Sequence, residues 1–177
     1  IHSERSRPFT TVTTKIMMKH RKPNRLKNYD YSRDGFYFVT ICTHNRKHYF
    51  GEIYNRRMQL NRYGKIVQKQ WLWLAEQYPY FEHDEHVFMP NHVHGIVIIN
   101  RSAVANVGNG RDRSLPKIKS LSELMGAFKT TSSKLIHDTG FTEFRWQKSF
   151  YDHIIRNDRS LFHIRKYIQN LSLIHIS

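Results

Sequence analysis

Two amphipathic stretches separate four short β-type runs, and this order limits the folds open to the chain. Residues 61–77 carry apolar side chains at helical spacing on one face. Residues 120–140 do the same, with a Ser120–Glu123 capping box at the start and Gly140 as a stop. The predicted order is strand, helix, strand, strand, helix, strand and a last helix. This is a ferredoxin-like α+β fold (βαββαβ): an antiparallel sheet with helices on one face and an extra C-terminal helix.

Four runs rich in β-branched and aromatic residues supply the strands. The predicted strands cover residues 35–44, 83–89, 92–99 and 144–157. A Pro90-Asn91 turn joins the second and third strands into a hairpin. The last helix covers residues 159–170, with Asn157 or Asp158 as its cap.

The charge of the chain points to a polyanionic partner. Lys and Arg number 29 against 14 Asp and Glu, a formal net charge of +15, which is more than solubility requires. The basic residues are spread among Tyr, Phe and Trp along the whole chain, which favours nucleic acid over a membrane surface. A generically basic protein, such as a ribosomal component, has the same composition, so charge alone leaves both classes open.

The chain length of 177 residues predicts one domain, over residues 25–170, with 100–119 as a mobile polar connector. Residues 1–24 are expected to be a disordered or non-native basic arm, and 171–177 an atypical tail. Cys42 is the single cysteine and lies in an apolar run, so we expect neither disulfides nor a cysteine zinc cluster. Neither a signal-peptide core nor a long apolar span is present, which predicts a cytoplasmic protein.

The segment "MPNHVHGIVIIN" places two histidines, His92 and His94, two residues apart at the start of a predicted strand. Alternate side chains of a strand share a face, so the two imidazoles can converge on one divalent ion. Two half-buried polar residues give the same pattern. The pair alone therefore leaves a metal site and a structural role both open.

Metal-assisted phosphoryl chemistry beside a basic surface requires a nucleophile. The Ser and Thr residues of "KTTSSK" belong to no triad-like signature, which leaves the tyrosines. Tyr167 and His163 lie one turn apart at the edge of the apolar stripe of the last helix, where they can face the sheet. An aromatic side chain that merely packs on the sheet has the same setting, so both interpretations stay open.

Three segments in order resemble motifs of the HUH-type single-tyrosine transposases, and most closely the REP-associated tyrosine transposases. "RLKNYDYSRDGFYFVTICTHNRKHYFGEI" is similar to their opening strand and "FMPNHVHGIVI" to the strand with the HUH motif. "WQKSFYDHIIRND" is similar to the block before their catalytic helix. The similarity runs from about Arg25 to Asn170, apart from the connector.

The resemblance implies that His92 and His94 bind Mg²⁺ or Mn²⁺ and that Tyr167 attacks a phosphate of single-stranded DNA. The implied intermediate is a 5′-phosphotyrosine beside a free 3′-OH, and the implied substrate is a REP-like hairpin with a single-stranded flank. Tyr151 lies in the strand before the helix, so a structural role is expected for it.

The end of the chain departs from the family's pattern. Asn170 stands at the third place after Tyr167, and the proline that follows in the family is missing. The resemblance gives the third ligand role to Asn170 or to Gln169.

The implied partner is single-stranded or hairpin DNA, in a bacterial cytoplasm and at the nucleoid, with no membrane contact. Monomer and homodimer are both open. The expected phosphate contacts are Arg21, Lys22, Arg25, Lys27, Lys129 and Lys134.

Two further functions compete with a DNA nickase and strand transferase. One is a hairpin-DNA-binding protein that is catalytically inactive, and the other is a metal-dependent hydrolase that uses water. A relaxase or replication initiator shares the HUH chemistry, but the chain carries no helicase region.

Overall fold

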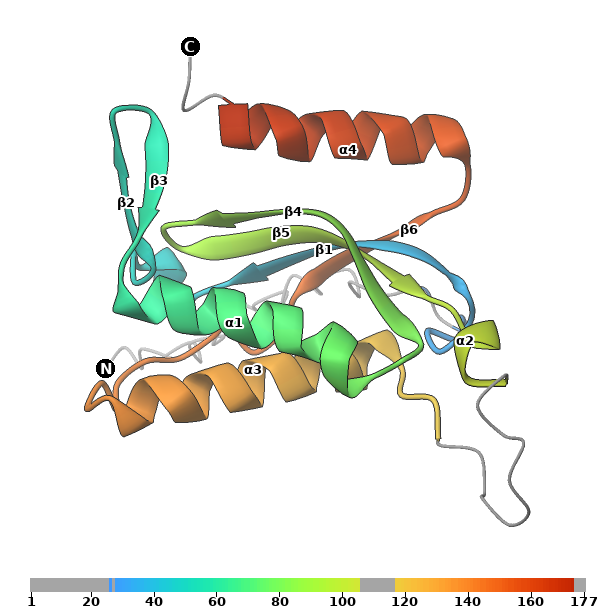
Figure 1. Cartoon of the computed structure of the whole chain (residues 1–177), viewed down its shortest axis with the longest axis horizontal. Coiled ribbons are helices and arrows are strands. Elements are labelled where there is room, and N and C mark those ends of the chain that lie inside the picture. The colour runs from blue at the N-terminus through green and yellow to red at the C-terminus, as the bar shows by residue number, and fades with distance from the viewer. Residues whose placement is uncertain (1–25, 27, 106–116, 174–177) are drawn as a thin grey trace, which may run out of the picture.

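The protein, a computed structural model described over residues 26, 28–105 and 117–173, is built on a four-stranded antiparallel sheet (Figure 1). The strands lie in the order β4 (Phe81–Met89), β5 (His92–Ile99), β1 (Gly35–Cys42) and β6 (Tyr151–Ile155). The helices α1 (Arg62–Gln77) and α3 (Leu121–Asp138) cover one face, and α4 (Asp158–Leu173) crosses the other. The predicted ferredoxin-like α+β class, with an extra C-terminal helix, is confirmed.

Side-chain caps begin the three long helices; those of α3 and α4 were predicted, whereas the cap of α1 was not. The Asn61 side chain accepts hydrogen bonds from two backbone amides at the start of α1, and Ser120 and Glu123 form the predicted capping box of α3. Of the two candidates for α4, Asn157 is the cap, because its Oδ1 accepts a hydrogen bond from the Ser160 amide at 2.8 Å. Local sequence therefore fixes all three starts.

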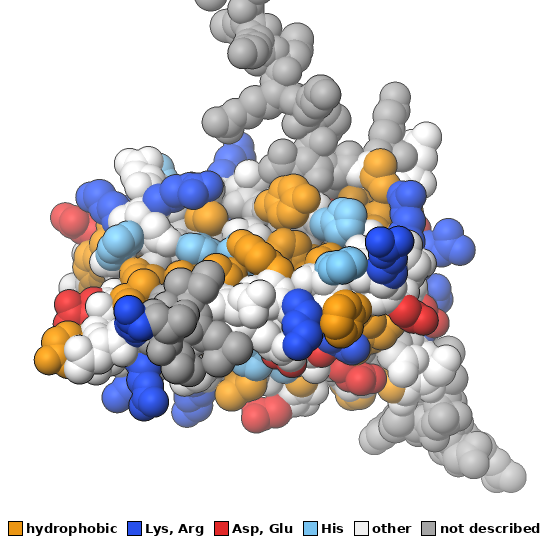
Figure 2. Space-filling model, turned by 90° about the horizontal axis from the view of Figure 1, so that it is seen from above, with side chains coloured by type: hydrophobic (Ala, Val, Ile, Leu, Met, Phe, Trp, Pro, Cys, Tyr) orange, Lys and Arg blue, Asp and Glu red, His pale blue; other side chains and the backbone are white. Residues whose placement is uncertain are grey.

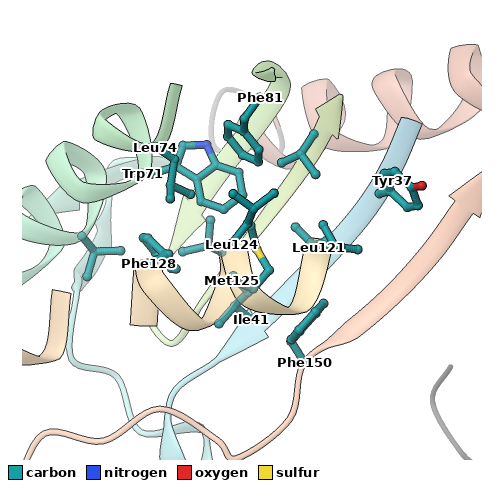
Figure 3. Packing of buried hydrophobic residues seen from close by; sticks show 14 of the residues in the cluster. Tyr37, Ile41, Trp71, Leu74, Phe81, Leu121, Leu124, Met125, Phe128 and Phe150 are labelled. Atoms are coloured by element: carbon teal, nitrogen blue, oxygen red, sulfur yellow. The ribbon is translucent and has the colours of Figure 1, made fainter. Parts of the chain in front are cut away.

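The main core lies between the sheet and the pair α1 and α3 (Figure 3). Trp71 of α1 is fully buried, and its ring meets Phe128 of α3 edge to face, with centroids 5.4 Å apart. A Cβ at Gly95 of β5 would come within 2.5 Å of Trp71 Cζ2, so glycine is what lets this indole lie on the sheet. This core holds the sheet against both helices.

The strand predicted over residues 144–157 was wrong in its first half, because β6 covers only Tyr151–Ile155. The carbonyls of Gln147 and Lys148 accept hydrogen bonds from the Lys129 ammonium at 2.5 and 3.1 Å. These two carbonyl oxygens therefore bond to a side chain and not to a neighbouring strand. The segment before β6 keeps only an isolated antiparallel bridge, between Thr43 and Trp146, and its aromatic side chains are buried without a continuous strand.

A second hairpin, β2 (Gly51–Tyr54) and β3 (Arg57–Leu60), projects beside the sheet and was missing from the prediction (Figure 1). Its two turn residues, Asn55 and Arg56, both have positive φ, the geometry of the tight turns that join antiparallel strands. A 3₁₀ turn over His44–Arg46 precedes it.

The predicted connector over residues 100–119 begins with a short helix, α2 (Ser102–Ala105), where the prediction had only a mobile loop. Residues 106–116 lie outside the described residues, as do the whole predicted arm, residues 1–24, and residues 174–177 of the predicted tail. Within the part of the chain that is described, no helix is long and apolar enough to span a membrane.

Candidate active site

The histidine pair lies at the beginning of β5, on the sheet face that α4 crosses. Val93, between the two histidines, is fully buried in the core under α1 and α3, so His92 and His94 face the opposite side. Their ring centroids are 4.5 Å apart, with the rings edge to face. The strand period therefore brings the two imidazoles together, as the sequence predicts.

Hydrogen bonds to Nδ1 set the orientation of both rings. Asn91 Oδ1 accepts a hydrogen bond from His92 Nδ1 at 2.6 Å, and the Asn91 amide nitrogen donates to the Arg46 carbonyl at 3.0 Å. His94 Nδ1 pairs with the Thr40 hydroxyl at 2.8 Å. In the tautomer that protonates Nδ1, Nε2 of each ring keeps a lone pair for a ligand bond.

The surroundings keep both rings neutral. Burial lowers the pKa of His94 to about 4, with a smaller contribution from His92. Burial also lowers the pKa of His92, assisted by the positive charge of Arg46 and by His48. A metal ligand must be unprotonated, and these shifts hold the pair in that state at neutral pH.

Tyr167 reaches this pair from α4. Its ring centroid is 5.7 Å from that of His94 and 6.2 Å from that of Phe38, and 47% of the residue is exposed. Phe38 of β1 also stacks on His94 at 5.4 Å, so these three rings form one aromatic cluster. The structure thus brings together the histidine pair and the tyrosine, which stand far apart in the sequence.

Two polar contacts join α4 to the neighbouring edge strand β4. Asp84 Oδ2 accepts hydrogen bonds from the Arg165 guanidinium at 2.7 and 2.8 Å, and Glu85 Oε1 accepts one from the Gln169 amide at 2.8 Å. Both acidic residues lie where the β4–β5 register shifts, a bulge that turns them toward α4. We call these two pairs the latch, because together with buried Ile168 they fix the position of α4 on the sheet.

The remaining predicted site residues lie apart from the pair or outside the described residues. Gln169 belongs to the latch, whereas Asn170 is exposed on α4 and has no side-chain hydrogen bond to another described residue. Lys129 and Lys134 line a groove of about 640 Å³ at α3, on the other face of the sheet. The residues described do not include Arg21, Lys22, Arg25 or Lys27.

The donor set fits a divalent cation that completes its shell with oxygen. Over residues 26, 28–105 and 117–173, no three His, Cys, Asp or Glu side chains come together to hold a metal. His92 and His94 would supply two nitrogens to such an ion, and oxygen ligands would come from an amide, a phosphate or water, as Mg²⁺ and Mn²⁺ prefer.

Sequence reasoning missed Thr40, Phe38 and the role of Asn91. Thr40 lies opposite His94 in the β1–β5 register, so its contact follows only from strand pairing. The sequence predicts Asn91 only as a turn residue. Its position directly before His92 is the signal that could have indicated its hydrogen bond to that ring. Tyr151 is 52% exposed, so its side chain is not part of the buried core.

Comparisons with known proteins place the chain in a family and a fold. No family model matches the sequence. An uncharacterized protein of Haemophilus influenzae is 37% identical over 168 residues, which cover 90% of this chain and 93% of that protein. The structure of a REP-associated tyrosine transposase bound to a REP hairpin superposes with a TM-score of 0.54 at 18% identity, covering 84% of this chain and 70% of the other. The chain therefore belongs to the family of the Haemophilus protein and has the fold of a REP-associated tyrosine transposase.

Proposed function

We propose that the protein is a metal-dependent DNA transposase that cleaves and rejoins single-stranded DNA at hairpin elements. The observation that carries this proposal is the placement of Tyr167 against His94, with His92 beside it. A neutral histidine pair and a half-exposed tyrosine on one sheet face are the parts that a metal-assisted attack on a phosphate needs.

The chemistry assigned to the site is one transesterification. The Tyr167 hydroxyl loses its proton and its oxygen bonds to the phosphorus, while the bond from phosphorus to the 3′ oxygen of the preceding nucleotide breaks. That oxygen leaves as a free 3′-OH, and the DNA stays attached through a 5′-phosphotyrosine. A bound Mg²⁺ or Mn²⁺ would stabilise the charge that develops on the phosphate. Attack by a 3′-OH reverses the step, so no nucleotide cofactor is needed.

The substrate class follows from charge and from the fold neighbour. The net charge of +15 suits a nucleic acid, and the neighbour with the same fold is bound to a REP hairpin. In this proposal Lys134, which lines the groove at α3, and the basic residues before position 28 contact DNA phosphates away from Tyr167, whereas the Lys129 ammonium already donates to the Gln147 and Lys148 carbonyls.

The test is a covalent capture assay. The protein is incubated with a labelled hairpin oligonucleotide that carries a single-stranded flank and with Mn²⁺, and adducts are resolved on a denaturing gel. We expect an adduct that Tyr167→Phe, His92→Ala and chelation of the metal each abolish. Tyr54→Phe is the matched control, because Tyr54 is an exposed tyrosine on the hairpin β2–β3, and it should leave the adduct intact.

Other outcomes select the competing functions. Tight hairpin binding without an adduct would identify a catalytically inactive DNA-binding protein. Cleavage that survives Tyr167→Phe would identify a hydrolase that uses water. An adduct lost in Tyr151→Phe but kept in Tyr167→Phe would move the nucleophile to β6.

A further inference from the structure

A groove of about 520 Å³ opens beside Tyr167, between the first turns of α4 and the strands β1 and β6. Phe38 lines this groove and also contacts Tyr167, so the groove and the candidate active site share a wall. His163 lines it as well and stands one helical turn before Tyr167. We call this space the flank groove.

The flank groove has an aromatic floor. Tyr151 of β6 lines it, is 52% exposed, and meets Phe38 edge to face with centroids 6.5 Å apart. Tyr151 also lies directly opposite Thr40 in the β1–β6 register, and Thr40 holds His94. An open tyrosine ring beside an apolar wall is the kind of platform on which an unpaired base stacks.

Apart from Ile164 of α4, basic and polar side chains complete the lining. Arg159, His153 and His163 line the groove together with Asn157 and Ser160, and no carboxylate is among the described residues that do so. Figure 2 looks onto the side of the molecule that α4 covers, where histidine, lysine and arginine side chains lie among exposed hydrophobic ones, with some acidic side chains toward the edges. Such a lining favours a ligand that has an aromatic ring and a negative charge.

We propose that the flank groove binds one unpaired nucleotide of the DNA strand, adjacent to the phosphate that Tyr167 attacks. The base stacks on Tyr151, and the phosphate of the same nucleotide lies toward Arg159. The volume is that of a pocket for one small ligand, too small for a duplex. The position next to the cleaved phosphate rests on the proposed function, whereas the binding of an unpaired nucleotide does not.

The test measures DNA binding without metal, so that it does not depend on cleavage. Fluorescence anisotropy is measured with a hairpin whose single-stranded flank carries an abasic site at each position in turn. We expect one position at which the loss of the base weakens binding to the wild-type protein by roughly tenfold. In Tyr151→Ala the intact hairpin should bind roughly tenfold more weakly, and the abasic site at that position should have no further effect.

Two variants separate stacking from other effects. Tyr151→Phe keeps the ring and should bind like the wild type, which would assign the loss to the ring and not to the hydroxyl; circular dichroism of Tyr151→Ala checks that this variant is folded. Phe162→Ala is the matched control, because Phe162 is an exposed aromatic residue of α4 that does not line the groove. Arg159→Gln should reduce the dependence of binding on the logarithm of the salt concentration by about one phosphate contact.

The results distinguish failure of this proposal from failure of the proposed function. If Tyr151→Ala binds as tightly as the wild type, or if the abasic penalty persists in that variant, the flank groove does not hold the nucleotide. That result would leave adduct formation by Tyr167 untouched. The opposite outcome is an abasic penalty at one flank position that disappears in Tyr151→Ala, in a protein that forms no adduct. It would support nucleotide binding in the flank groove and reject the catalytic proposal.

Discussion

The two faces of the sheet differ sharply, although the same strands supply both. Toward α1 and α3, the strands present apolar side chains such as Tyr37, Val39 and Val97 to a large aromatic core. Toward α4 there is a small apolar cluster around Ile168, and next to it the histidine pair and Tyr167. One face thus carries the stability of the fold, which frees the other to hold polar and half-exposed groups close together.

The largest difference between the faces should be seen in cavity variants. Trp71→Ala removes a fully buried indole from the main core and should lower the free energy of unfolding by about 3–5 kcal/mol. Leu161→Ala, on the side of α4 that packs on the sheet, should cost about 2 kcal/mol, because its apolar cluster is small and the side chain already keeps 9% exposure. Urea unfolding followed by circular dichroism measures both, and equal losses would contradict the comparison.

Neighbouring residues of β5 should separate stability from chemistry. Val93→Ala opens the main core and should cost about 2 kcal/mol, yet the protein should still form the DNA adduct. His92→Ala loses one hydrogen bond to Asn91, about 1 kcal/mol, and should abolish the adduct. Unfolding and adduct yield are measured on both variants. An adduct that survives His92→Ala would remove the histidine pair from the site.

Local rules explain how much of this could be predicted from sequence. The caps at Ser120 and Asn157 and the shared face of His92 and His94 depend on residues within a few positions, so the sequence predicts them. The contact between Thr40 and His94 spans 54 positions and depends on strand register, which no local pattern encodes. The flank groove and the latch arise only when α4 docks, and for that reason neither was predicted.

Weakening the latch should have a moderate effect that falls on α4 alone. Asp84→Asn removes the ion pair with Arg165, whose side chain is 41% exposed, so we expect a loss of about 1 kcal/mol or less that shrinks at high salt. Because the latch positions the helix that carries Tyr167, adduct formation should slow while hairpin affinity stays the same. Hydrogen exchange should rise in α4 and not in α1. Unchanged exchange in α4 would show that apolar packing alone fixes this helix.

The smallest effect should come from His83, a titratable group on the apolar face. Its ring centroid lies 5.2 Å from that of Trp71, and neither ring nitrogen has a well-formed hydrogen bond within the described residues. The backbone at Trp71 and Leu72 lies near the ring and acts to raise the pKa of His83, but this effect is smaller than that of burial. Burial, with a smaller contribution from His86, lowers its pKa from 6.5 to about 4.

Between those two pH values the unfolded chain binds a proton at His83 that the folded protein does not, so stability falls as the pH drops from 6.5 toward 4. His83→Phe removes this contribution, whereas His94, whose pKa is also lowered to about 4, keeps its own. The difference in free energy of unfolding between variant and wild type should therefore shift in favour of the variant from pH 7 to pH 5. Urea unfolding at both pH values measures it, and a difference that is independent of pH would mean that His83 titrates alike in the folded and unfolded states.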